Sequence, residues 1–121
     1  MVKSSFYYEV RASFMATQYP NRAFDLERHL RDAAAGDAQA RYTLGVAYSC
    51  GSFGIAIDLI EAHKWFNLAA LAGSEAGQES RAELAEEMTA REIVDAQRAA
   101  RAWLRDNGHI GGAAASLRLA A

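Results

Sequence analysis

Three histidines and one cysteine are the side chains here best suited to bind a metal ion or to act in nucleophilic and acid–base catalysis. Helical metal sites commonly place two ligands four residues apart, on one face. No such spacing relates Cys50 to the histidines, or the histidines to one another: His29, His63 and His109. We therefore expect no metal and no cofactor. We interpret His29 as a partly buried packing residue and Cys50 as a small apolar group, with a reactive thiol as the alternative for Cys50.

Other catalytic patterns are also missing from the sequence. The segment Gly51-Ser52-Phe53-Gly54 is not followed by Lys and Ser or Thr, and it follows no predicted strand, so it does not match a phosphate-binding loop. No nucleophile has a base nearby in sequence, although folding could bring one close. We expect that the protein is not an enzyme. A pocket that gathers His29 or His63 with carboxylates would favour the alternative of a small enzyme.

Charge and composition narrow the classes of partner. The 121 residues include 13 basic and 15 acidic side chains, a formal charge of -2, which leaves no excess of cations to neutralise nucleic-acid phosphates. No segment approaches the roughly 20 apolar residues that span a bilayer. Residues 1–16 lack the apolar stretch of a secretory signal. We expect a soluble, cytoplasmic protein that binds neither nucleic acid nor membrane.

The elements that would position functional residues are helices. A single proline, abundant alanine and few β-branched residues favour helix, and glycines supply the breaks. We expect an all-α fold of about five helices, over about 21–35, about 37–50, Asp58 to the break at Gly73, Ser74 onward, and Thr89 to the stop signal Asn107-Gly108. The predicted inner faces of the last four consist of Ala40, Leu44, Ala47 and Tyr48; Ala62, Trp65, Phe66, Ala69 and Ala70; Gly77, Ser80, Leu84 and Met88; and Ile93, Ala96, Ala100, Trp103 and Leu104.

Two predicted helix starts carry a capping box, in which an N-cap side chain and the third helical residue satisfy each other's backbone amides. One pairs Thr89 with Glu92, and the other pairs Asp58 with Glu61.

We divide the chain into three parts. They are a helical domain over residues 21–107, an N-terminal segment 1–20 that is either a covering helix or a tail, and a disordered tail over 108–121. The last three residues, Leu119-Ala120-Ala121, resemble the end of bacterial tags that recruit unfolding proteases.

A short pattern occurs twice, which indicates a helical repeat. The segment EAHKWFNLAALAG, residues 61–73, has a weaker counterpart in LERHLRDAAAG, residues 26–36. Residues 33–73 resemble a Sel1-like repeat, a relative of the tetratricopeptide repeat. The matching positions are Gly36, Ala40, Leu44, Gly45, Tyr48, Gly51, Gly54, Ile55, Asp58, Ala62, Trp65, Phe66, Ala69, Ala70 and Gly73.

The resemblance implies a short α-solenoid of antiparallel helix pairs in a right-handed superhelix, and a role as an adaptor or regulatory scaffold. Gly45 would permit a close approach of two helices, and Trp65 and Phe66 would fill the space between layers. Two features depart from the family: Gly51 and Gly54 are one residue further apart than its usual loop glycines, and Ala56 stands where proline is frequent. Residues 74–105 match loosely, as a degenerate terminal pair.

Two surfaces are candidates for binding a partner protein. Tyr42, Val46 and Ser49 lie opposite the apolar stripe of their helix, so we expect them either to contact a partner or to pack against a neighbouring segment. The second candidate is a face of glutamates that includes Glu79 and Glu86, followed by a helix with four arginines. Solvated faces are the favoured interpretation there, and an electrostatic docking site is the alternative.

The leading functional hypothesis is a protein–protein interaction module with no catalysis. The alternative is a structural subunit that self-associates as a homo-oligomer, because a stack of about two helix pairs is short and could expose apolar ends. A small enzyme is the lowest alternative.

Overall fold

The computed structural model describes residues 25–51 and 54–107. Within these residues the chain forms five helices and no strand, as predicted for an all-α fold. They are α2 (Leu26–Ala34), α3 (Ala38–Cys50), α4 (Leu59–Leu71), α5 (Glu75–Ala85) and α6 (Ala90–Asn107). The expectations for residues 1–20 and 108–121, including His109 and the Leu119-Ala120-Ala121 tag, lie outside the described residues.

Local capping residues define where the first four of these helices begin. The side chains of Asp37, Asp58 and Ser74 each accept from a backbone amide of the following turn, as expected for N-caps. Asp25 does the same for the Arg28 amide at 3.1 Å, so α2 begins at Leu26. The predicted start of this helix near Asn21 was therefore too early, because the residue that caps its first turn is Asp25.

One of the two predicted capping boxes is complete and the other is half formed. Thr89 and Glu92 exchange both bonds, with the Thr89 amide donating to Glu92 Oε1 at 2.9 Å and the Glu92 amide to Thr89 Oγ1 at 3.1 Å. Asp58 accepts from the Glu61 amide at 3.1 Å, but its own amide donates to the Tyr48 carbonyl at 3.0 Å. Glu61 instead pairs with Lys64 at 3.0 Å.

The connection after α3 requires glycine. Gly51 has a φ of 69°, in the left-handed region, and its amide donates to the Ala47 carbonyl at 2.9 Å, which ends α3. A side chain at this position would also lie 2.7 Å from Ile57 Cγ1. Gly54 has a positive φ as well, so both loop glycines of the repeat pattern adopt backbone conformations that favour glycine.

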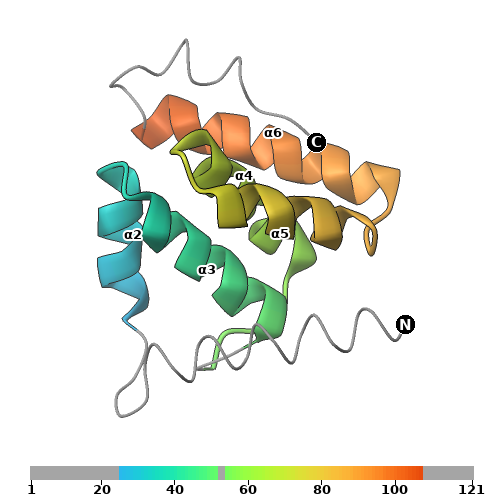
Figure 1. Cartoon of the computed structure of the whole chain (residues 1–121), viewed down its shortest axis with the longest axis horizontal. Coiled ribbons are helices and arrows are strands. Elements are labelled where there is room, and N and C mark those ends of the chain that lie inside the picture. The colour runs from blue at the N-terminus through green and yellow to red at the C-terminus, as the bar shows by residue number, and fades with distance from the viewer. Residues whose placement is uncertain (1–24, 52–53, 108–121) are drawn as a thin grey trace.

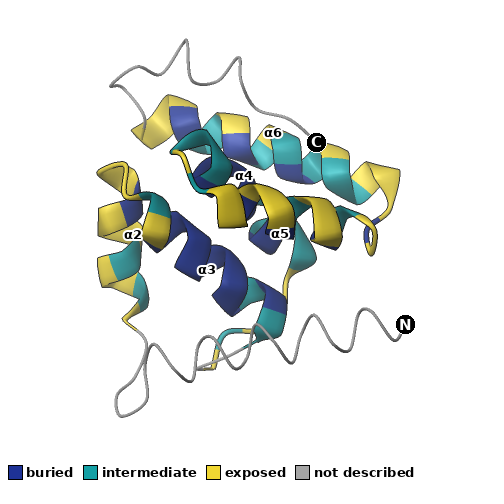
Figure 2. Cartoon of the chain, viewed as in Figure 1, coloured by how far each residue is buried: buried dark blue, intermediate teal, exposed yellow. Residues whose placement is uncertain are grey.

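Helix α4 is the centre of the fold. It packs against α3, α5 and α6, while α2 packs against α3 (Figure 1). Trp65, Phe66 and Leu68 of α4 are fully buried, and the Trp65 ring meets Trp103 of α6 edge to face with centroids 5.3 Å apart. Figure 2 shows α3 buried along most of its length, whereas α5 and α6 each keep an exposed side.

Two glycines let the neighbouring helices approach α4 closely. A Cβ at Gly45 of α3 would lie 2.5 Å from Phe66 Cδ1, and one at Gly77 of α5 would lie 2.9 Å from Ala69 Cβ. Such distances are far below ordinary van der Waals contact, so both interfaces depend on the missing side chain. The predicted role of Gly45 at a helix contact is confirmed.

Candidate protein-binding surface

The first predicted partner surface is buried. Tyr42 is 7% exposed, and Val46 and Ser49 are 0% exposed. The Tyr42 ring packs against Phe66 with centroids 5.6 Å apart, and the Ser49 hydroxyl donates to the Val46 carbonyl at 2.9 Å. The expectation that these three residues face away from the core was wrong, and the packing alternative holds. Helix α3 is buried on more than one side, so the face opposite its apolar stripe is also inside the molecule (Figure 2).

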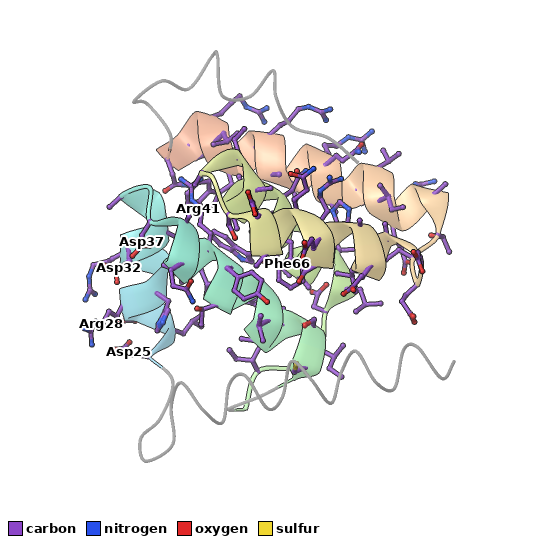
Figure 3. All side chains as sticks on the ribbon, in the orientation of Figure 1. Asp25, Arg28, Asp32, Asp37, Arg41 and Phe66 are labelled. Atoms are coloured by element: carbon purple, nitrogen blue, oxygen red, sulfur yellow. The ribbon has the colours of Figure 1, made fainter. Side chains whose placement is uncertain are left out.

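Arg41 is a buried cation that sequence reasoning missed. Its Nε donates to the Ala33 carbonyl and its Nη1 to the Leu68 carbonyl, both at 3.0 Å, and the guanidinium lies 5.1 Å from the centroid of the Trp103 ring. Arg41 thus reaches from α3 to the last turns of α2 and α4 and to α6 (Figure 3). A cation near two helix C-termini is favourable because the carbonyl end of a helix carries partial negative charge.

Burial and a neighbouring carboxylate act in opposite directions on this group. Desolvation lowers the pKa of the Arg41 guanidinium, and the charge of Asp37 partly raises it. A guanidinium remains protonated under ordinary conditions, so Arg41 is a permanent positive charge inside the fold. Two of its five donors bond to backbone carbonyls of its own chain and the side chain is buried, which indicates a structural role. Position 41 is three residues before Leu44 and seven before Tyr48, so helical spacing alone places it on the inner face.

His63 is the second buried polar residue of interest. It is fully buried, and neither ring nitrogen has a hydrogen-bond partner among the described residues. Desolvation, together with the positive charge of Arg81, lowers the pKa of His63 from its ordinary value of 6.5 to about 4. The imidazole is therefore neutral at pH 7. It has no exposed surface through which a substrate could reach it.

The other candidate chemical groups are dispersed. His29 is half-buried, and its Nδ1 donates to the Asp25 carbonyl at 2.8 Å, within the start of its own helix. The thiol of Cys50 is half-buried, and its sulfur lies 3.8 Å from the Ser49 hydroxyl. In the part of the chain that the structure describes, no three His, Cys, Asp or Glu side chains are grouped as a metal site requires.

The outer side of α5 is acidic. Exposed glutamates recur along this helix and just after it, at Glu75, Glu79, Glu83, Glu86 and Glu87. We call them the α5 acidic face. The one basic residue of the helix, Arg81, is half-buried on the side toward His63. Glu79 and Glu86, predicted as partner-binding residues, are thus exposed on a face whose charges all have one sign.

The outer side of α6 is basic. Four exposed arginines follow one another at helical spacing, at Arg91, Arg98, Arg101 and Arg105. We call them the α6 basic face. Val94, which is 42% exposed, lies among them. Asp95 is 3.8 Å from both Arg91 Nε and Arg98 Nη1, so its single charge is shared between two cations.

Comparison with known proteins adds no family assignment. No protein-family model, no curated protein and no solved structure matches the chain. Among the described residues, no helix has the length and apolar character needed to cross a bilayer.

Proposed function

We propose that the chain is a protein–protein interaction module, an adaptor or regulatory scaffold of the Sel1-like type, and that it binds protein partners through the outer faces of α5 and α6. The observation that carries the proposal is the α6 basic face, four exposed arginines on one side of an 18-residue helix. Arginine is enriched at protein interfaces because its planar group makes several directed hydrogen bonds. The other side of α6 packs on α4, so the basic side is free to meet a partner.

The arrangement of helices supports a solenoid of the Sel1-like type. Helices α3 and α4 would form one antiparallel pair, with α2 as the second helix of a preceding unit. Helices α5 and α6, expected as a degenerate terminal pair, both pack on α4 and scarcely contact each other. Consecutive packing of α2, α3, α4 and α5, with α6 on α4, agrees with such a stack, in which each unit contacts its neighbours. The fit of Gly45 against Phe66, two positions of the repeat pattern, also supports it.

Affinity capture with a matched control tests this proposal. The tagged full chain, the variant Arg98→Glu/Arg101→Glu on α6, and the control Arg28→Glu/Arg31→Glu on α2 are used to capture proteins from the source cells. All four positions are exposed, and both variants change the charge equally. We expect at least one captured protein to be lost from the α6 variant and kept by the control. Equal capture by all three proteins, with the fold intact, would contradict the proposed use of α6.

A further inference from the structure

The α6 basic face extends along most of its helix. From Arg91 to Arg105 there are 14 steps, which at about 1.5 Å each give roughly 21 Å. The Arg91 and Arg98 side chains are 86% and 75% exposed, and their contacts to Asp95 are long. Arg101 and Arg105 make no ion pair with any described residue. The face therefore keeps a net positive charge that the rest of the described structure does not neutralise.

The α5 acidic face is a counterpart of similar length in the same chain. From Glu75 to Glu86 there are 11 steps, or roughly 17 Å. Ala82 is exposed between the glutamates, so a second helix could lie close to α5 with long side chains on either side of it. Glutamates along one helix and arginines along the other are the arrangement that gives complementary potentials across an interface.

The two faces belong to separate helices that both pack on α4, and α6 begins at the Thr89–Glu92 capping box. The ion pairs of the α6 arginines with described residues are to Asp95 of α6 itself. A second copy of the chain supplies an acidic face of similar length at the same concentration as the basic one. Because the two surfaces differ, their contact is head-to-tail, and each end of an assembly keeps one face that no second copy occupies.

We propose that a second copy of this chain docks its α5 acidic face on the α6 basic face. This inference rests on the proposed function, in that it names a partner for the same face. Val94, exposed within the basic face, and Ala82, exposed within the acidic one, supply the apolar contact between the charged rows.

Sedimentation equilibrium of the full chain tests the contact. The wild type is measured from about 5 to about 500 µM, at about 50 mM and about 500 mM salt. Two charge-reversed variants are measured in the same way: Arg98→Glu/Arg101→Glu on α6, and Glu79→Arg/Glu86→Arg on α5. Circular dichroism verifies that both keep their helices, and Arg28→Glu/Arg31→Glu is the control.

We expect the wild type and the control to self-associate, with a dissociation constant that rises at least about tenfold at high salt because exposed charges are screened. Each reversed variant alone should associate at least about tenfold more weakly, because like charges would face each other. An equimolar mixture of the two should recover association, because the intact α5 of the α6 variant meets the intact α6 of the α5 variant.

Three results would overturn the proposal: a wild type that stays monomeric throughout, association that salt does not weaken, or a mixture of folded variants that does not associate. These results are separate from the test of the proposed function. A monomeric wild type whose captured protein is still lost on α6 reversal would leave the interaction module standing without the second copy. Self-association through these faces, together with capture that the α6 reversal does not change, would support the contact between two copies and contradict the proposed use of α6 for other partners.

Discussion

Arg41 of α3 contacts three other helices, α2, α4 and α6. It donates to carbonyls in the last turns of α2 and α4, each of which also accepts a backbone amide, from Gly36 and Ala72 respectively. Its loss would remove two charge-assisted bonds without leaving either carbonyl wholly unpaired. Because charged residues are rarely buried, the predicted inner face of α3 did not include Arg41.

The variant Arg41→Met should lower the free energy of unfolding by about 2 kcal/mol, because hydrogen bonds from a charged donor contribute about 1.5 to 3 kcal/mol and some desolvation cost is recovered. The exposed control Arg28→Met should change it by no more than about 0.5 kcal/mol. Urea denaturation measures both values. Equal stabilities of Arg41→Met and the wild type would show that the buried guanidinium does not join these helices.

His63 links stability to pH. Its pKa is about 4 in the folded chain and near 6.5 when unfolded, so the unfolded state binds a proton first as the pH falls. The contribution is fully present above pH 6.5 and is lost as the pH falls toward 4. Between pH 7 and 5 we expect the wild type to lose up to about 2 kcal/mol more than His63→Leu, which has no titrating group there. Parallel pH profiles of the two proteins in urea denaturation would contradict this.

At the scale of elements, the contact between α3 and α4 depends on Gly45. In Gly45→Ala the new methyl would lie 2.5 Å from Phe66 Cδ1, so the helices or the ring must move. Alanine favours helix over glycine by up to about 1 kcal/mol, but overpacking costs about 1 to 3 kcal/mol. We expect a net loss of about 1 to 2 kcal/mol in thermal or urea unfolding.

The variant Phe66→Leu, alone and combined with Gly45→Ala, tests whether contact with the Phe66 ring causes the loss of stability in Gly45→Ala. In the double mutant the smaller side chain leaves room for the methyl group, so the effects of the two substitutions should differ from additivity by at least about 1 kcal/mol. Additive effects would mean that Gly45→Ala acts on α3 alone and not through the helix contact.

The two capping sites give a matched pair of predictions for the helix starts. Glu92 accepts from the Thr89 amide, whereas Glu61 pairs with Lys64 and leaves the Asp58 amide to Tyr48. Glu92→Ala should therefore destabilise the protein by about 0.5 to 1 kcal/mol, and Glu61→Ala by less than about 0.5 kcal/mol. Equal losses on chemical denaturation would contradict this distinction.

Three of the helix starts were predictable because their signals are local. Asp58, Ser74 and Thr89 each precede a run of helical residues and cap it in the structure. The surface on α3 was not predictable in the same way. Tyr42 and Val46 lie opposite an apolar stripe, a pattern that normally indicates exposure, but α3 lies inside the fold and is buried on both sides. Burial of a second face depends on tertiary neighbours that one helix's periodicity does not encode.

At the scale of the whole molecule, the described helices differ in how much of their surface the fold uses. Helices α3 and α4 are largely enclosed, whereas α5 and α6 each have an exposed side (Figure 2). That side carries the acidic face on α5 and the basic face on α6. Charge periodicity in the sequence located both sides, including Glu79 and Glu86. The exposure of these two charged sides was predictable, because the apolar stripe of each helix lies on its opposite side and packs on α4.

Amide chemical-shift mapping by NMR, with a captured protein titrated into the isotope-labelled full chain, locates the binding surface residue by residue. We expect the perturbed amides to concentrate in α5 and α6, over residues 75–87 and 91–105, while the buried centre of α3 and the exposed side of α2 change little. Perturbations concentrated on α2, with α5 and α6 unchanged, would contradict the assignment of these two faces as the binding surface.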